Sequence, residues 1–295
     1  MTDHKKYYPS KILLFGEYTI IDGSNALAIP FKKFKSRWNF DTQKDNTEFV
    51  PFIEYLMNID WKKYNTFFNQ EKLFADLKRG LYFDSNIPVG YGAGSSGSIT
   101  AAIFDSYFKK NDLNIYQIKN ILSLIEGFFH GVSSGIDPMV SYLKKALKLI
   151  DKTEFELIDK VDVTFENYSL YLLDTKVKRE TKKYVDIYNN EIKTKEFKEK
   201  ILPKMIFLNN NIISSFLISD EKKCFSLLNE ISSLQYKHFK KMIIPSIEKL
   251  WIESLGSEDF SMKLCGAGGG GFYLLMIKKG FETNMLFNNL ELIKI

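Results

Sequence analysis

The sequence is poor in the two residue types that most often build disulfide frameworks and metal cages. It has two cysteines and three histidines in 295 residues. Two thiols in a chain of this length argue against a disulfide scaffold and favour a reducing compartment. So few cysteines and histidines also argue against a Cys/His zinc site. We therefore expect a cytoplasmic protein without structural disulfides.

Long hydrophobic runs are missing as well. No segment approaches the ~20 apolar residues that a membrane-spanning helix needs, and the first ten residues, MTDHKKYYPS, contain no apolar signal core. Charge of one sign is not in strong excess, because 41 basic residues stand against 36 acidic ones and the surplus is scattered. This balance suits an anionic small-molecule substrate without requiring one, and we expect neither a nucleic-acid partner nor a membrane.

What the sequence does have is enough apolar content for two domains or one large one. Hydrophobic residues make up 45% of the chain and aromatic residues 15%. A strand-like run at 168–177 is followed by a mostly helical stretch to about residue 254, and then by strand, glycine turn and strand. This order indicates an α+β second domain. We predict two domains, at residues 1–160 and 161–295.

The first half of the chain predicts strands followed by helices. Strand-like runs cover residues 11–21 and the approach to Pro30, and helical patterns cover 95–110, 114–131 and 136–150. Pro138 lies in the first turn of the third predicted helix, where proline is tolerated.

A glycine-rich stretch, VGYGAGSSGSITAAIF (89–104), precedes the first of these helices. Glycine lets backbone amides approach a ligand, and a helix N-terminus attracts anions. Residues 92–98 can therefore cradle a phosphate. No lysine follows Gly97, which excludes a P-loop. Gly92, Gly94 and Gly97 do fit the dinucleotide fingerprint, but no acidic residue ends a strand at the required distance, so a dehydrogenase is the weakest alternative.

Three motifs resemble those of the GHMP kinases. Residues 88–97, PVGYGAGSSG, are similar to the family's P-x-x-x-G-L-G-S-S-A, and residues 9–18, PSKILLFGEY, to its P-G-K-x-x-L-x-G-E-H. Residues 263–271, KLCGAGGGG, are similar to its K-L-T-G-A-G-G-G-G. All three occur in the family's order, so the resemblance is specific.

Two further stretches resemble the branch of the family that phosphorylates mevalonate. They are EGFFHGVSSGID (126–137) and DTKVKRET (174–181). The chain also departs from the family pattern. Tyr18 stands in place of the usual histidine, Ser133 in place of proline, and Gly97 and Ser98 in place of two alanines. Because the G-E-Y form is also seen in phosphomevalonate kinases, Tyr18 leaves the acceptor open.

The resemblance implies an α+β fold of two domains. The N-terminal, ATP-binding domain would be ribosomal protein S5 domain 2-like, the C-terminal domain ferredoxin-like, and the active site would lie in the cleft between them. The implied activity is transfer of phosphate from ATP, with Mg²⁺, to mevalonate, giving 5-phosphomevalonate in isoprenoid biosynthesis. The alternatives are a relative acting on phosphomevalonate, homoserine or a sugar, and a catalytically silent ligand-binding homologue. A homodimer stays open.

The resemblance also assigns roles to residues. Asp137 would activate the acceptor hydroxyl and Lys11 would lie beside it. Ser96 and Glu126 would be the Mg²⁺ ligands. For His130, which the resemblance gives no catalytic role, we expect a structural one. The residues that would bind ATP are Gly90, Gly92, Ala93, Gly94, Ser95, Ser96, Gly97 and Ser98. The residues that would bind the acceptor are Glu17, Tyr18, Arg179, Thr181, Gly266, Ala267 and Gly268.

Overall fold

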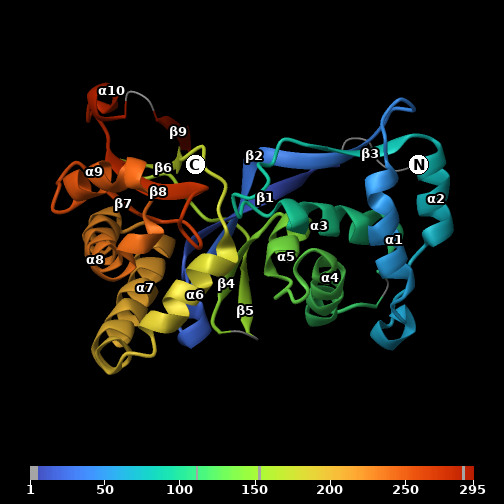
Figure 1. Cartoon of the computed structure of the whole chain (residues 1–295), viewed down its shortest axis with the longest axis horizontal. Coiled ribbons are helices and arrows are strands. Elements are labelled where there is room, and N and C mark those ends of the chain that lie inside the picture. The colour runs from blue at the N-terminus through green and yellow to red at the C-terminus, as the bar shows by residue number, and fades with distance from the viewer. Residues whose placement is uncertain (1–5, 111, 152–153, 288–289) are drawn as a thin grey trace. The chain divides into compact units, whose positions relative to one another are not determined.

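The computed structural model of the chain describes residues 6–110, 112–151, 154–287 and 290–295 (Figure 1). The chain forms two compact units. The described residues of unit 1 come from 1–11, 30–88 and 93–145, and those of unit 2 from 12–29, 89–92 and 146–295. The units thus divide the chain differently from the predicted domains at residue 160, which stay a prediction.

Two strands, β1 (Tyr8–Phe15) and β2 (Ala26–Phe40), run through both units and neighbour each other in one sheet. In unit 1, the far end of β2 pairs antiparallel with β3 (Leu81–Ser85). In unit 2, the first residues of β2 pair antiparallel with β4 (Ala146–Leu149), which pairs with β5 (Phe155–Ile158).

The described part of unit 1 contains helices α1 (Val50–Met57), α2 (Gln70–Lys78), α3 (Ser95–Tyr107), α4 (Ile115–His130) and α5 (Ile136–Leu143). Helices α3, α4 and α5 pack against one another (Figure 1). A capping box fixes the start of α4. The Asn114 side chain accepts a hydrogen bond from the backbone N–H of Gln117, and the Gln117 side chain accepts one from the backbone N–H of Asn114. The predicted helices at 95–110 and 114–131 are confirmed.

The third predicted helix, over 136–150, is wrong in its second half. Helix α5 ends at Leu143, and Lys144 follows with a left-handed backbone (φ 57°). The next residues form β4, in which Ala146 and Leu147 pair with Ile158 and Leu157 of β5. The apolar pattern of this short segment suits either structure, and the strand pairing decides between them.

Unit 2 contains a four-stranded antiparallel sheet in the order β7-β8-β6-β9. Its strands are β6 (Tyr168–Asp174), β7 (Phe260–Leu264), β8 (Phe272–Lys278) and β9 (Glu291–Lys294). With a helical stretch between β6 and β7 and α10 (Thr283–Leu286) between β8 and β9, the chain order is the β-α-β-β-α-β order of ferredoxin-like folds. The predicted α+β class is confirmed.

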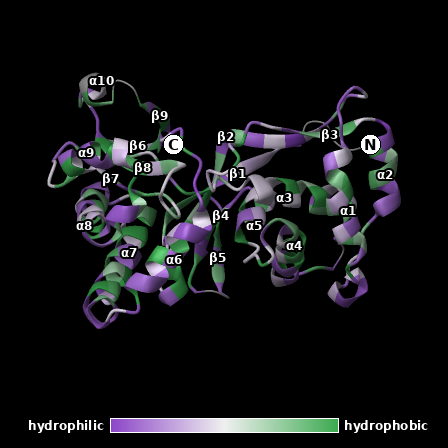
Figure 2. Ribbon diagram, viewed as in Figure 1, coloured by the Kyte–Doolittle hydropathy of each residue, from purple (hydrophilic) through white to green (hydrophobic). Residues whose placement is uncertain are grey.

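The long helical stretch of unit 2 comprises α6 (Thr181–Glu191), α7 (Leu202–Leu217), α8 (Glu221–Phe239) and α9 (Pro245–Ser254). Helices α8 and α9 pack against β7, and α7 packs against α8. Trp251 and Tyr273 are fully buried between α9 and the sheet, in edge-to-face contact. Figure 2 shows hydrophobic and hydrophilic bands alternating along α7, as expected of a helix with one buried face.

In the part of the chain that the structure describes, no helix combines the length and the apolar character needed to cross a membrane.

Candidate active site

The glycine-rich stretch ends where helix α3 begins. Gly94 is the N-cap of α3, with a left-handed backbone (φ 78°) that glycine adopts without strain. A side-chain carbon at Gly94 would lie 3.3 Å from Lys11, and one at Gly97 would lie 2.8 Å from the backbone of Asp137. Because neither position has a side chain, the first turn of α3 packs directly against β1 and α5.

The structure brings the two predicted catalytic residues of unit 1 together. Lys11 Nζ lies 2.7 Å from Asp137 Oδ1, and the backbone N–H of Lys11 donates to Ala93 O at 2.9 Å. The Lys11 side chain is 10% exposed and that of Asp137 is 32% exposed. Asp137 lies in the first turn of α5, where the helix dipole favours a carboxylate. The result is an ion pair whose carboxylate a ligand can reach.

Glu126, on the buried face of α4, has both carboxylate oxygens engaged by hydroxyl groups. Ser96 Oγ donates to Oε1 at 3.0 Å, and Ser133 Oγ donates to Oε2. The residue is only 4% exposed. Burial, and then the negative charge of nearby Asp137, raise the pKa of Glu126 to about 7. The charge of Lys11 already opposes this rise in pKa. A further positive charge close to Glu126 would therefore favour the ionised form of its carboxylate.

This pair of oxygen donors fits a magnesium ion. Carboxylate and hydroxyl oxygens are hard ligands, and Mg²⁺ takes one or two protein ligands together with waters and substrate phosphates. Within the described ranges, no three His, Cys, Asp or Glu residues gather closely enough to hold a metal by themselves. Ser96 and Glu126 would thus hold Mg²⁺ only together with a bound phosphate, at the N-terminus of α3. Their role stays a prediction.

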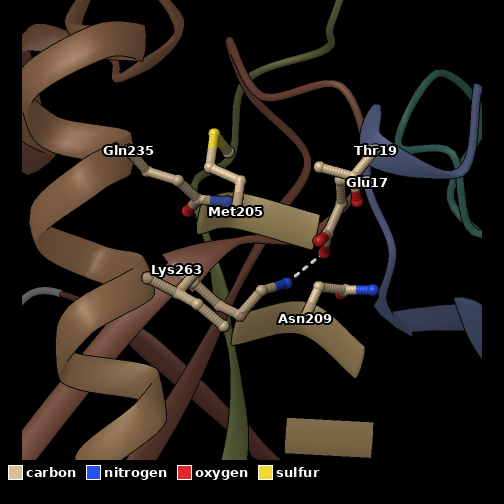
Figure 3. Close-up of a pocket in the computed structure, with 7 residues that line it drawn as sticks. Glu17, Thr19, Met205, Asn209, Gln235 and Lys263 are labelled. Carbon is tan, nitrogen blue, oxygen red and sulfur yellow. Dashed lines mark hydrogen bonds and ion pairs between the residues drawn. The ribbon is translucent and has the colours of Figure 1, made fainter. Parts of the chain in front are cut away.

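In unit 2, predicted residue Glu17 lies in the interior rather than on an open surface. Its carboxylate forms an ion pair with Lys263, and the two side chains are 3% and 1% exposed. Lys263 Nζ also donates to Leu14 O and to Leu264 O. Figure 3 shows the amine pointing at the carboxylate inside a small pocket. That pocket is also lined by Thr19, Met205, Asn209, Ile231 and Gln235.

Burial raises the pKa of Glu17, and the charge of Lys263 opposes that effect. Lys263 is the first residue of the motif KLCGAGGGG at 263–271, the last glycine motif of the chain. The ion pair therefore joins the end of β1 to the start of the last glycine motif. The motif pattern by itself assigns no role to Lys263. The signal was present, because a single charged residue between Met262 and Leu264 in an apolar strand predicts a buried partner of opposite charge.

Tyr18 is buried against the last glycine motif. Its hydroxyl donates to Ala267 O at 2.6 Å, and its ring stacks on Tyr188 with centroids 4.7 Å apart. The backbone of Tyr18 has φ 63°, which costs energy for a residue with a side chain. Burial raises the pKa of Tyr18 above its ordinary value, so the hydroxyl stays a neutral donor.

Arg179 lies where two glycines leave room for it. A side-chain carbon at Gly92 or at Gly266 would collide with its guanidinium group. Arg179 Nη1 donates to Cys265 O at 3.1 Å, and its backbone N–H donates to Gly90 O at 3.0 Å. The arginine thereby joins the Val89–Gly92 segment to the last glycine motif within unit 2.

The other predicted binding residues are divided between the two units. Thr181 is exposed and begins α6. Gly268 has a left-handed backbone, and a side-chain carbon there would lie 2.8 Å from Met242 O. Ala93, Gly94 and Ser95 to Ser98 fall in unit 1, whereas Gly90 and Gly92 fall in unit 2.

A contact that sequence reasoning missed joins Ser96 to His130. His130 Nε2 lies 2.9 Å from Ser96 Oγ. Since the single O–H of Ser96 donates to Glu126, the imidazole is the donor in this arrangement. The signal was the spacing of Glu126 and His130, which lie one turn apart on α4 and so can share a neighbour.

The chain is similar to known proteins of one family. Residues 62–145 match the family profile described as "GHMP kinases N terminal domain". A solved structure titled "Crystal structure of mevalonate kinase" has a TM-score of 0.67 and 22% identity, and covers 98% of this chain and 97% of that one. The chain therefore has the α+β fold of the GHMP kinases, and the predicted resemblance to them is confirmed.

Particular relatives are similar over nearly the whole chain. The mevalonate kinase of Dictyostelium discoideum is 22% identical, over 95% of this chain and 89% of its own length. That of Methanocaldococcus jannaschii is 24% identical, over 94% and 93%. A Streptococcus pneumoniae phosphomevalonate kinase in complex with phosphomevalonate and AMPPNP also has a TM-score of 0.67, at 14% identity, covering 98% of this chain and 99% of that one. The fold alone thus does not separate these two acceptors.

Proposed function

We propose that the chain is a kinase that transfers the γ-phosphoryl group of ATP to the hydroxyl of mevalonate, giving 5-phosphomevalonate. The observation that carries the proposal is the Lys11–Asp137 ion pair, packed against the first turn of α3 at Gly94 and Gly97. Phosphoryl transfer needs positioning and neutralisation of charge more than covalent chemistry, and this arrangement offers both.

The residues of unit 1 would divide the work among them. The first N–H groups of an α-helix have no partner within the helix, so those of α3 would bind phosphate oxygens. Asp137 would accept the proton of the acceptor hydroxyl as the hydroxyl oxygen attacks the γ-phosphorus, while the bond from that phosphorus to the β-phosphate oxygen breaks and ADP leaves. Lys11 would orient the Asp137 carboxylate through their ion pair and offset negative charge on the attacking oxygen. Mg²⁺ held by Ser96 and Glu126 would neutralise charge on the nucleotide phosphates.

The choice of mevalonate is supported by the two curated relatives described above. Both are mevalonate kinases, and the match to this chain covers 89% and 93% of their lengths. Arg179 would suit an acceptor with a carboxylate, because its planar guanidinium binds carboxylates through two hydrogen bonds. Phosphomevalonate is the second candidate acceptor, and Tyr18 in place of the family's usual histidine is the observation that favours it.

An ATP-consumption assay tests the proposal directly. The purified chain is given ATP and Mg²⁺ with mevalonate, phosphomevalonate, homoserine or galactose in turn. We expect turnover with mevalonate and none with galactose. Turnover with phosphomevalonate alone would replace the acceptor while leaving the kinase assignment in place. Absence of turnover with every acceptor, in a protein that still binds AMPPNP, would favour the catalytically silent homologue.

A further inference from the structure

Ser133 stands where the mevalonate kinase segment that residues 126–137 resemble has proline, and its side chain makes a contact that proline cannot make. Its hydroxyl donates to Oε2 of Glu126, the oxygen that Ser96 does not use. The two serines come from different elements, Ser96 from the first turn of α3 and Ser133 from the turn between α4 and α5. Together they hold the carboxylate from both sides.

The Ser133 side chain is itself held in place. The backbone N–H of Gly135 donates to Ser133 Oγ at 2.9 Å, so the single O–H of the hydroxyl is left to point at Glu126. Ser123 Oγ donates to Ser133 O at 2.5 Å, which ties the turn to α4. A hydroxyl with a fixed acceptor contact and a fixed donor contact has little rotational freedom left.

The same turn leads into the predicted catalytic residue. Gly135 is the N-cap of α5 and has φ 73°, and a side-chain carbon there would lie 2.5 Å from Lys119 O. Asp137 follows two residues later. Ser133 therefore connects the carboxylate of Glu126 to the turn that starts α5.

We propose that Ser133 is a positioning residue for the magnesium site, orienting the Glu126 carboxylate so that Oε1 and Ser96 Oγ face one metal ion. The inference rests on the proposed function, since it assumes that Glu126 and Ser96 bind Mg²⁺ with a nucleotide. Groups that orient a metal ligand through a hydrogen bond change metal affinity by about 10–100-fold when they are removed. A residue that only stabilised the turn would not change it.

The test measures AMPPNP binding by calorimetry, once with saturating Mg²⁺ and once with EDTA. Ser133→Ala removes the donor, Ser133→Thr keeps it, and Ser134→Ala is the matched control. Ser134 is exposed, lies in the same turn, and accepts a 3.4 Å hydrogen bond from the backbone N–H of Ile136. The melting temperature of each variant, measured without Mg²⁺, reports on the fold.

We expect Ser133→Ala to weaken AMPPNP binding about tenfold with Mg²⁺ and to leave it unchanged in EDTA. Ser133→Thr and Ser134→Ala should bind like the wild type under both conditions. If Ser133→Ala does not fold, Ser133→Cys replaces it, because its thiol is similar in size and a weak donor. The expected order of affinities is the same.

Equal binding by Ser133→Ala and the wild type in Mg²⁺ would overturn the inference and leave the kinase proposal intact. An equal loss in Ser133→Ala and Ser134→Ala would also overturn it, since the turn as a whole would then be responsible. If the wild type itself shows no gain in AMPPNP affinity on adding Mg²⁺, the proposed function fails and the inference fails with it.

Discussion

Each unit contains a lysine–carboxylate pair, and the two pairs differ in one respect that separates chemistry from architecture. Lys11 and Asp137 in unit 1 are 10% and 32% exposed, whereas Lys263 and Glu17 in unit 2 are 1% and 3% exposed. Each pair joins a lysine ammonium group to a carboxylate. Only the first pair leaves a carboxylate that a ligand can reach. The second is closed off, and its ammonium group binds two backbone carbonyls as well.

A charged residue in a motif therefore does not by itself mark a reacting group. Both lysines belong to motifs that resemble those of GHMP kinases. Lys11 would act on the substrate, whereas Lys263 holds the start of the last glycine motif against the end of β1. Four substitutions, at Asp137, Glu17, Glu126 and Tyr18, test this difference between the units, and we expect the largest effect at Asp137 and the smallest at Tyr18.

The first prediction concerns the accessible ion pair, Lys11–Asp137. Asp137→Asn keeps the shape of the side chain but cannot accept a proton. We expect kcat to fall by about 100-fold to 10,000-fold, while the Kd for AMPPNP stays the same because the amides of α3 are untouched. Steady-state kinetics and calorimetry measure the two quantities. Activity close to that of the wild type would remove Asp137 from the mechanism.

The buried pair is broken next. Glu17→Gln leaves the Lys263 ammonium without a counter-charge in the interior, which costs about 3–5 kcal/mol of unfolding free energy. Urea denaturation measures it. Lys249→Ala is the matched control, since its pair with Glu253 spans 3.9 Å at the surface and such pairs contribute about 0.3–0.5 kcal/mol. Similar losses in both variants would show that burial does not distinguish the pairs.

A third prediction concerns pH. Because the pKa of Glu126 is about 7 in the folded protein and near 4.3 when unfolded, the folded state binds the extra proton between these values. The unfolding free energy should therefore be highest below about pH 4 and fall by roughly 3 kcal/mol as pH rises to 7, with respect to this group.

Glu126→Gln removes that group, so the variant should lose this part of the pH dependence and exceed the wild type in stability above pH 7. Denaturation at a series of pH values without Mg²⁺ measures it. Parallel stability curves for wild type and variant would contradict the raised pKa.

The smallest effect is expected at Tyr18. Tyr18→Phe keeps the stacking on Tyr188 but removes the donor to Ala267 O, which costs about 1 kcal/mol. If that contact positions the glycine motif beside the acceptor, the KM for mevalonate should rise while the KM for ATP is unchanged. A rise in both KM values would indicate a general disturbance of unit 2.

How far the sequence reaches can be judged from particular residues. Helices α3 and α4 follow from apolar spacing and capping residues, because those signals are local. The strand β4 does not, since its pairing with β2 and β5 is what separates it from a continuation of α5. Pairing partners distant in sequence are not visible in a local pattern.

The candidate site shows the same limit. The motifs single out Lys11, Asp137, Glu126 and Ser96, and the structure brings all four of them close together in unit 1. The motifs alone placed Glu17 beside the acceptor, whereas the structure buries it with Lys263. Burial depends on what packs around a residue, and that information lies in segments such as α7 and α8, which carry no motif.

The Glu17–Lys263 contact has a consequence for synthesis of the protein. The two residues are 246 positions apart, so Glu17 leaves the ribosome long before its partner has been translated. Until then a carboxylate destined for the interior stays hydrated, and unit 2 cannot close around it. The segment that contains Glu17 therefore cannot complete its packing until nearly the whole chain has been synthesised. Nascent chains that stop short of residue 263 should be captured by chaperones or degraded.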